Sequence, residues 1–153
     1  MKTIDTILFA TDFSEISDYA FDYASSLAAT CNARLVIVHV VAHQVDLRNF
    51  YVPHISFDEL DKQVEAGAKK RMSDFRDKCR GWFPDATAYV VIGIPHEEIL
   101  KKAVEENASL IVMGTHGRQG FEHFIFGSTA ERIVKMAHCP VLTVRPPHQP
   151  AQG

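Results

Sequence analysis

Five short apolar runs recur along the sequence, and within each run the apolar residues are continuous rather than alternating. They cover residues 7–10, 35–41, 88–92, 110–113 and 141–144. A strand that is apolar on both faces has to be covered by helices on both sides, as in parallel sheets. Segments of helical periodicity separate the runs, and parallel neighbours need such crossovers. The pattern therefore predicts a single doubly wound, mostly parallel five-stranded α/β sheet with helices on both faces.

Four segments carry apolar residues at the three-to-four spacing of an amphipathic helix. The first has its apolar face at Ile16, Ala20, Tyr23, Ala24 and Leu27. The second, residues 57–79, has its apolar face at Phe57, Leu60, Val64, Ala68, Phe75 and Cys79. The third, residues 95–107, opens with a proline at the first helical position, and the fourth covers residues 128–138. Ser128 and Glu131 fit a capping box at the start of the fourth helix.

Size and charge limit the kind of protein that the chain can form. A length of 153 residues is that of one domain, which we expect over residues 1–146, with a disordered tail at 147–153. A net charge of -3 argues against a generic nucleic-acid binder. No stretch of about 18 apolar residues occurs, and no signal for export is apparent, so neither export nor membrane insertion is expected.

Cys31, Cys79 and Cys139 are widely spaced beside apolar residues. An odd number of scattered cysteines is typical of free thiols in a reducing compartment, and we expect all three to be buried in a cytoplasmic protein. The sequence contains no CxxC pair and its eight histidines are scattered along the chain, which argues against a zinc site.

The most distinctive loop follows the fourth predicted strand and reads MGTHGRQGFEHFIFGSTAE. Glycines such as Gly114 and Gly127 let the backbone approach an anion closely, and the helix that follows adds the positive end of its dipole. Ser128 and Thr129 add hydroxyl donors, and Arg118 adds a fixed cation. Neither a Walker-type lysine nor a GxGxxG pattern is present. The loop predicts a triphosphate cradle, although the glycines could simply close a loop and Ser128 could simply cap a helix.

The spacing Gly114-x2-Gly117-x9-Gly127-Ser128 resembles the nucleotide-binding motif of the ATP-binding branch of the universal stress protein family. The segments ILFATDFSE, VIVHVV, LIVMGTHGRQG and GSTAERIVKMAHCPVLTVRP are also similar to that family, so the resemblance covers nearly the whole chain. It implies a Rossmann-like, adenine nucleotide alpha hydrolase-like fold with strand order 3-2-1-4-5. In such a sheet the ligand lies where the winding direction reverses, here between the first and fourth strands.

The resemblance also implies which residues contact the nucleotide. Ala10, Thr11 and Asp12 would line it near the ribose and base, and Val40 would hold the adenine edge through its backbone. The ribose and phosphates would be followed by Met113, Gly114, Thr115, His116, Gly117 and Arg118. Gly127, Ser128 and Thr129 would bind the β- and γ-phosphates of ATP, with Mg²⁺ or Mn²⁺ bound alongside. Asp12 would meet that ion through water, and an equally supported alternative is that Asp12 only caps the first helix together with Glu15.

Several functions are compatible with such a cradle. We expect a nucleotide-responsive stress or regulatory switch with an unidentified protein partner and at most slow ATP hydrolysis, because nothing marks His116, Glu122 or His123 as a catalytic base. The alternatives are a slow ATPase and a nucleotide-free scaffold. A phosphoacceptor receiver domain is excluded because Asp12 has no adjacent acid and Arg145 and prolines stand where a lysine is needed.

The last predicted strand begins at Val141 and leads to Arg145, and it would lie at the edge of the sheet. An unpaired edge can pair with another chain. The family resemblance implies that this strand pairs with its copy in a homodimer. The alternative is an edge blunted by the flanking prolines and Arg145.

Overall fold

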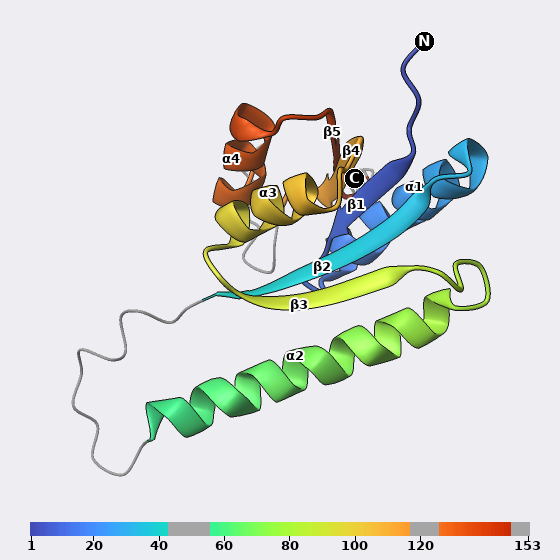
Figure 1. Cartoon of the computed structure of the whole chain (residues 1–153). Coiled ribbons are helices and arrows are strands. Elements are labelled where there is room, and N and C mark those ends of the chain that lie inside the picture. The colour runs from blue at the N-terminus through green and yellow to red at the C-terminus, as the bar shows by residue number, and fades with distance from the viewer. Residues whose placement is uncertain (43–55, 117–125, 148–153) are drawn as a thin grey trace, which may run out of the picture.

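The computed structural model describes residues 1–42, 56–116 and 126–147, and within them the chain forms a five-stranded parallel sheet (Figure 1). The strands are β1 (Thr6–Ala10), β2 (Arg34–Ala42), β3 (Thr87–Gly93), β4 (Leu110–Gly114) and β5 (Val141–Val144). The helices are α1 (Glu15–Cys31), α2 (Phe57–Cys79), α3 (Pro95–Glu105) and α4 (Ser128–Met136). The strand order is β3-β2-β1-β4-β5, which confirms the predicted doubly wound sheet.

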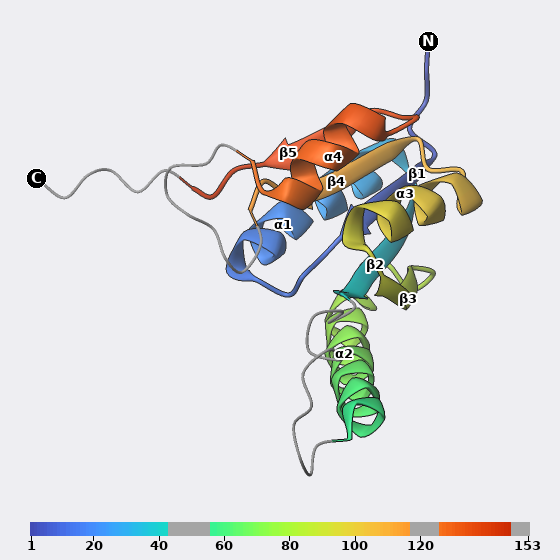
Figure 2. The same cartoon turned by 90° about the vertical axis from the view of Figure 1, so that its left-hand side faces the viewer.

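The sheet is covered on both faces, which explains the continuous apolar runs. Phe9 of β1 is fully buried against α1 and α2, where its ring centroid lies 5.2 Å from that of Phe21 and 6.1 Å from that of Phe75. Leu8 and Ile111 point to the opposite face and pack under α3 and α4. Figure 2 shows α3 and α4 in front of the sheet and α1 behind it. Strands β1 and β4 are therefore central and apolar on both sides.

Some residues that were predicted to face inward are exposed. Leu60 and Val64 of α2 are 38% and 42% exposed. The 23 residues of α2 measure about 34 Å, whereas the seven residues of β3 measure about 23 Å. The first turns of α2 therefore extend beyond the sheet (Figure 1). Tyr23 of α1 is also exposed, and its hydroxyl lies 3.1 Å from that of Tyr19.

The prediction that all three cysteines are buried is wrong. Cys79 is buried, whereas Cys139 is half-buried and Cys31 is exposed near the end of α1. Burial raises the pKa of the Cys79 thiol to about 11. Only the thiolate is nucleophilic, so this thiol is unreactive in the folded protein.

We expect one fast-reacting thiol when the native protein is treated with a disulfide-exchange reagent at pH 8. Cys31 should react within minutes because it is exposed, whereas Cys79 should react only after unfolding. The release of reagent measured by absorbance gives both phases. Cys31→Ser is the control and should lack the fast phase. Fast labelling of Cys79 in the folded protein would contradict this burial.

Glu106 directly follows α3 and connects the end of that helix to β2 and β3. Its carboxylate accepts hydrogen bonds from Arg34 at the start of β2 (2.8 Å) and from the Tyr89 hydroxyl of β3 (2.6 Å). The bond from Tyr89, and then that from Arg34, lower the pKa of Glu106 below its ordinary value of 4.5. The Glu106 side chain is 14% exposed and that of Arg34 is 42% exposed, so the bond from Tyr89 is the better shielded of the two.

Glu106→Gln is expected to lower the free energy of unfolding at pH 7 by about 1–2 kcal/mol, because charge-assisted bonds become neutral ones. A depressed pKa means that the stabilisation is complete above the ordinary glutamate pKa and is lost as the pH falls through the lower folded-state value. The difference in the free energy of unfolding between wild type and variant should therefore disappear in acid. Urea unfolding at pH 7 and at pH 3 measures this difference. An equal difference at both pH values would contradict a stabilising role of the ionised Glu106 carboxylate.

Several predictions concern residues outside those described. Gly117, Arg118, Glu122 and His123 are among them, as are residues 148–153 of the predicted tail. The domain boundaries of 1–146 and 147–153 stay a prediction. Across the parts of the chain that the structure describes, no helix has the length and apolar character needed to cross a membrane.

Candidate functional site

The turn after β1 is built around the buried side chain of Thr11. Its backbone N–H donates to Val38 O (2.9 Å), which extends the sheet by one residue. Its hydroxyl oxygen accepts hydrogen bonds from Phe13 N (3.0 Å) and Ser17 Oγ (2.7 Å). A hydroxyl oxygen has two lone pairs, so these two bonds use its acceptor capacity. The side chain of Thr11 therefore shapes the turn.

Asp12 lies in this turn but does not cap α1. Its Oδ1 accepts from Ser14 N (3.0 Å), whereas the N-cap is Ser14, whose side chain accepts from Ser17 N at 3.2 Å. The alternative that Asp12 is only the cap of the first helix is therefore wrong. Phe13, the next residue, has φ of 60°. A bulky residue in this left-handed region costs about 1–3 kcal/mol, and such strain concentrates at functional sites.

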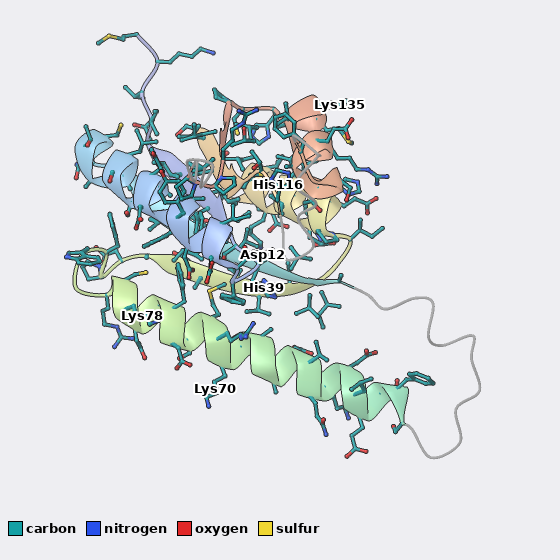
Figure 3. All side chains as sticks on the ribbon, turned by 180° about the vertical axis from the view of Figure 1, so that it is seen from behind. Asp12, His39, Lys70, Lys78, His116 and Lys135 are labelled. Carbon is teal, nitrogen blue, oxygen red and sulfur yellow. The ribbon has the colours of Figure 1, made fainter. Side chains whose placement is uncertain are left out.

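His39 of β2 holds the turn from the neighbouring strand. Its Nδ1 donates to Thr11 O (2.8 Å), and its ring lies 4.4 Å from the ring of Phe13, centroid to centroid. Figure 3 shows His39 close to Asp12, near the start of α1. These contacts fix the strained turn against β2.

β2 extends past the end of β1, and Val40 lies on this extension. Ala10, the last residue of β1, pairs with Val38. Successive residues of a strand turn their backbone groups to opposite sides. Because Val38 O faces β1, the N–H and C=O of Val40 face the same side, beyond the last residue of β1. The backbone groups of Val40 are therefore not paired with β1, and their contact with a base stays a prediction.

Thr115 joins the end of β4 to the start of α4. Its N–H donates to Val144 O (2.9 Å), and its C=O accepts from Gly127 N at 2.7 Å. Its hydroxyl lies 2.8 Å from His116 Nδ1. The segment that leaves the sheet after residue 116 is thus brought back to it at Gly127.

Gly114 has a packing role that sequence reasoning missed. A Cβ added at this residue would lie 2.9 Å from Cγ2 of Ile16 in the first turn of α1. Glycine lets the first turn of α1 approach the carboxyl end of β4 closely. The two residues are far apart in sequence, and no local pattern signals the contact.

The predicted capping box at α4 is wrong. The N-cap is Gly127, Ser128 is the first helical residue, and no side chain of the described residues caps the helix. Glu131, the expected partner, accepts instead from Lys135 Nζ at 2.6 Å. Among the residues that the structure describes, no side chain accepts from the first backbone N–H groups of α4, and the helix dipole adds about half a positive charge there. Such a helix start can bind an anion such as phosphate.

Most of the predicted site residues lie at one edge of the sheet. β1 pairs with β2 on one side and with β4 on the other, so the winding direction reverses at the carboxyl ends of β1 and β4. At or beside that edge are Ala10, Thr11, Asp12, Val40, Met113, Gly114, Thr115, His116, Gly127, Ser128 and Thr129. Gly117 and Arg118 lie outside the described residues. Contact of these residues with a nucleotide stays a prediction.

No metal-ligating cluster is formed by the residues whose positions are described: no group of three or more His, Cys, Asp or Glu side chains could hold an ion among them. Asp12 is the acidic residue that lies in the β1–α1 turn. A divalent ion at this edge would therefore need oxygen donors from a ligand, as phosphates supply.

The fold and the switch-point edge define a Rossmann-like, doubly wound α/β protein. The family model of the universal stress protein family matches residues 3–145, and the chain belongs to this family. It is 33% identical over 144 residues to the universal stress protein YxiE of Bacillus subtilis, covering 91% of this chain and 97% of that protein.

Two solved structures show how far the likeness in three dimensions extends. The universal stress protein UspA from Lactobacillus plantarum has a TM-score of 0.80 at 24% identity, covering 95% of this chain and all of that one. A universal stress protein in complex with cAMP has a TM-score of 0.63 at 26% identity, covering 94% of this chain and 98% of that one. The first likeness supports the fold alone, and the second protein binds an adenine nucleotide.

Proposed function

We propose that the protein binds ATP, together with Mg²⁺ or Mn²⁺, at the carboxyl ends of β1 and β4 and acts as a nucleotide-responsive stress or regulatory switch. The observation that carries this proposal is the uncapped start of α4, which the bond from Gly127 N to Thr115 O (2.7 Å) holds at the switch point of the sheet. The relative in complex with cAMP supports an adenine nucleotide as the ligand class.

Each part of the nucleotide has a counterpart at this edge. The outward-facing backbone of Val40 fits the adenine edge, and Asp12 in the β1–α1 turn fits the ribose side. Gly127, Ser128 and Thr129 fit the β- and γ-phosphates through the first N–H groups of α4 and two hydroxyls. The rest of the nucleotide site would be lined by Ala10, Thr11, Met113, Gly114, Thr115 and His116. Gly117 and Arg118 would lie beside the phosphates.

The divalent ion would neutralise phosphate charge and supply Lewis acidity when bound. Asp12 would hold it through water, because no described cluster offers a complete ligand set. Efficient hydrolysis is not part of the proposal. His116 Nδ1 is occupied by the Thr115 hydroxyl (2.8 Å), and no other described side chain at this edge is placed as a general base. The switch would therefore hydrolyse ATP slowly at most.

The first test is to denature the purified protein and identify any released nucleotide by chromatography. The proposal predicts ATP or another adenine nucleotide in the supernatant. No nucleotide, together with no detectable binding of added ATP and Mg²⁺, would favour a nucleotide-free scaffold instead. Phosphate release at many turnovers per minute would favour an ATPase.

We also propose a cytoplasmic homodimer formed through β5. No described strand pairs with the outer edge of β5. Thr115 N donates to Val144 O, and Ile111 N donates to Pro140 O. The even-numbered residues of this segment therefore turn their backbone N–H and C=O groups toward β4, whereas those of Thr143 point outward. An edge of this kind can pair with its copy in an isologous contact. Three free cysteines are consistent with the reducing cytoplasm.

Thr143→Pro is expected to convert the dimer to a monomer, because proline removes an outward N–H without disturbing the bonds to β4. Light scattering on a sizing column should give twice 17.1 kDa for the wild type and 17.1 kDa for the variant. Thr143→Val keeps the N–H and should remain dimeric. A wild-type monomer, or a dimeric Thr143→Pro, would refute pairing through β5.

A further inference from the structure

A groove lies between α2 and β3, on the edge of the sheet opposite to β5. Its volume is about 310 Å³. Ala88 and Val90 of β3 form its floor, and side chains of α2 form its wall. The groove is separate from the nucleotide edge, where β1 and β4 end. A ligand of this groove would therefore be distinct from the nucleotide.

The outer edge of β3 is open. β3 pairs with β2 on one side, and no described strand pairs with it on the other. Sheet edges are usually protected by lysine, proline or a bulge. The seven residues of β3 read TAYVVIG and include neither lysine nor proline. Its backbone donors and acceptors are thus available to an added strand.

Six residues of α2 and its C-cap line the groove above this edge, among them Met72 and the acid Asp77. Lys69, Ser73, Arg76 and Arg80 are spaced four, three and four residues apart, which places them on one side of the helix. We call the three bases of this set, Lys69, Arg76 and Arg80, the basic stripe. The opposite flank of α2 faces the β1–α1 turn, where the Arg71 guanidinium lies 5.9 Å from the centre of the Phe13 ring. The basic stripe therefore faces the open edge of β3, along which α2 runs (Figure 1).

The charges of the basic stripe are only weakly satisfied within the chain. Lys69 pairs with Glu65 at 2.6 Å, and Arg80 pairs with Asp77 at 3.3 Å. Exposed pairs of this kind contribute about 0.3–0.5 kcal/mol, so an incoming carboxylate can replace them. Among the described residues, no ion pair of Arg76 is seen. The lining thus holds three bases and one acid, a local excess of positive charge in a chain with a net charge of -3.

We propose that the groove binds an extended peptide segment with acidic side chains at alternate positions, added to the sheet beside β3. The backbone of the peptide would satisfy the open edge, and every second side chain would point toward the basic stripe. A second copy of this chain fits poorly, because edge-to-edge pairing would bring two basic stripes together. This proposal does not depend on nucleotide binding.

The test uses a fluorescent seven-residue peptide in which threonine and glutamate alternate, titrated with the full chain by anisotropy. We expect binding that the double variant Arg76→Glu, Arg80→Glu weakens at least tenfold. Lys70→Glu is the matched control, because Lys70 lies on the same helix and points away from the sheet (Figure 3). It should leave the affinity unchanged. Circular dichroism confirms that each variant is folded.

Two further peptides separate the contributions of charge and backbone. A peptide with lysine in place of glutamate tests charge, and one with N-methylated alternate amides tests strand pairing; neither should bind. The proposal is overturned if the glutamate peptide does not bind, if the double variant binds it as the wild type does, or if the lysine peptide binds equally. Binding of a single-stranded oligonucleotide in place of the peptide, dependent on Arg76, would also overturn it.

Discussion

Gly127→Val is expected to weaken ATP binding at least 100-fold while the protein remains folded. Gly127 is the N-cap of α4, with φ of −70° and ψ of 161°, which valine adopts without strain. Its N–H can still donate to Thr115 O. The branched side chain, however, would occupy the space through which a phosphate approaches the first N–H groups of α4. A 100-fold loss corresponds to about 2.7 kcal/mol of binding free energy.

Gly67→Val is the matched control for this prediction. Gly67 lies in α2, and a Cβ added there meets nothing within 4 Å. The same chemical change should therefore leave both the fold and the ATP affinity unchanged. Binding is measured by calorimetry, and folding by circular dichroism. An unchanged affinity in a folded Gly127→Val variant would show that no phosphate binds at the start of α4.

Gly114→Ala is expected to lower the free energy of unfolding by about 2–3 kcal/mol, through overpacking between α1 and β4. The new Cβ would lie 2.9 Å from Ile16 Cγ2, closer than two carbon atoms can approach. The β-branched side chain of Ile16 has a restricted χ1 angle and cannot rotate away freely. The first turn of α1 would have to move, and with it the turn that carries Asp12. Urea unfolding measures the change.

A double-mutant cycle with Ile16→Ala isolates this contact. Ile16→Ala removes Cγ2, so alanine at residue 114 should fit in its presence. The double variant should be more stable than the sum of the two single changes predicts, by at least about 1 kcal/mol, because contacting residues couple. Additive effects would mean that the Gly114 contact with α1 does not limit packing.

The sheet could be predicted because its signal is local and repeated. The runs that became β1 and β4 are apolar throughout, and only a strand covered on both faces needs that composition. The bounds of α2 were predicted as residues 57–79, which matches the observed Phe57–Cys79. The position of the site follows from strand order, since polar and glycine-rich segments come directly after the two strands at the switch point.

The helix caps could not be predicted because candidates lie within one turn of each other. At α1 both Asp12 and Ser14 are good caps, and Ser14 is the one whose side chain accepts from Ser17 N, directly after Phe13 with its φ of 60°. At α4 the bond from Gly127 N to Thr115 O fixes where the helix begins, one residue before Ser128. Both decisions rest on tertiary contacts, which propensity does not contain.

The exposure of Leu60 and Val64 could not be predicted either, because it also depends on tertiary structure. Apolar spacing predicts which face of α2 turns inward, but it cannot tell that the helix extends past the sheet. The contact of Gly114 with Ile16 likewise joins two distant segments. Sequence spacing thus located the elements and predicted a site that stays a prediction, whereas lengths and packing partners needed the structure.

The most direct measurement is a calorimetric titration of nucleotide-free protein with ATP and Mg²⁺. The uncapped start of α4 at the switch point predicts saturable heat with one ATP per chain, retained in Gly67→Val and lost in Gly127→Val. No heat in the folded wild-type protein, or equal binding by Gly127→Val, would contradict a nucleotide site at this edge of the sheet.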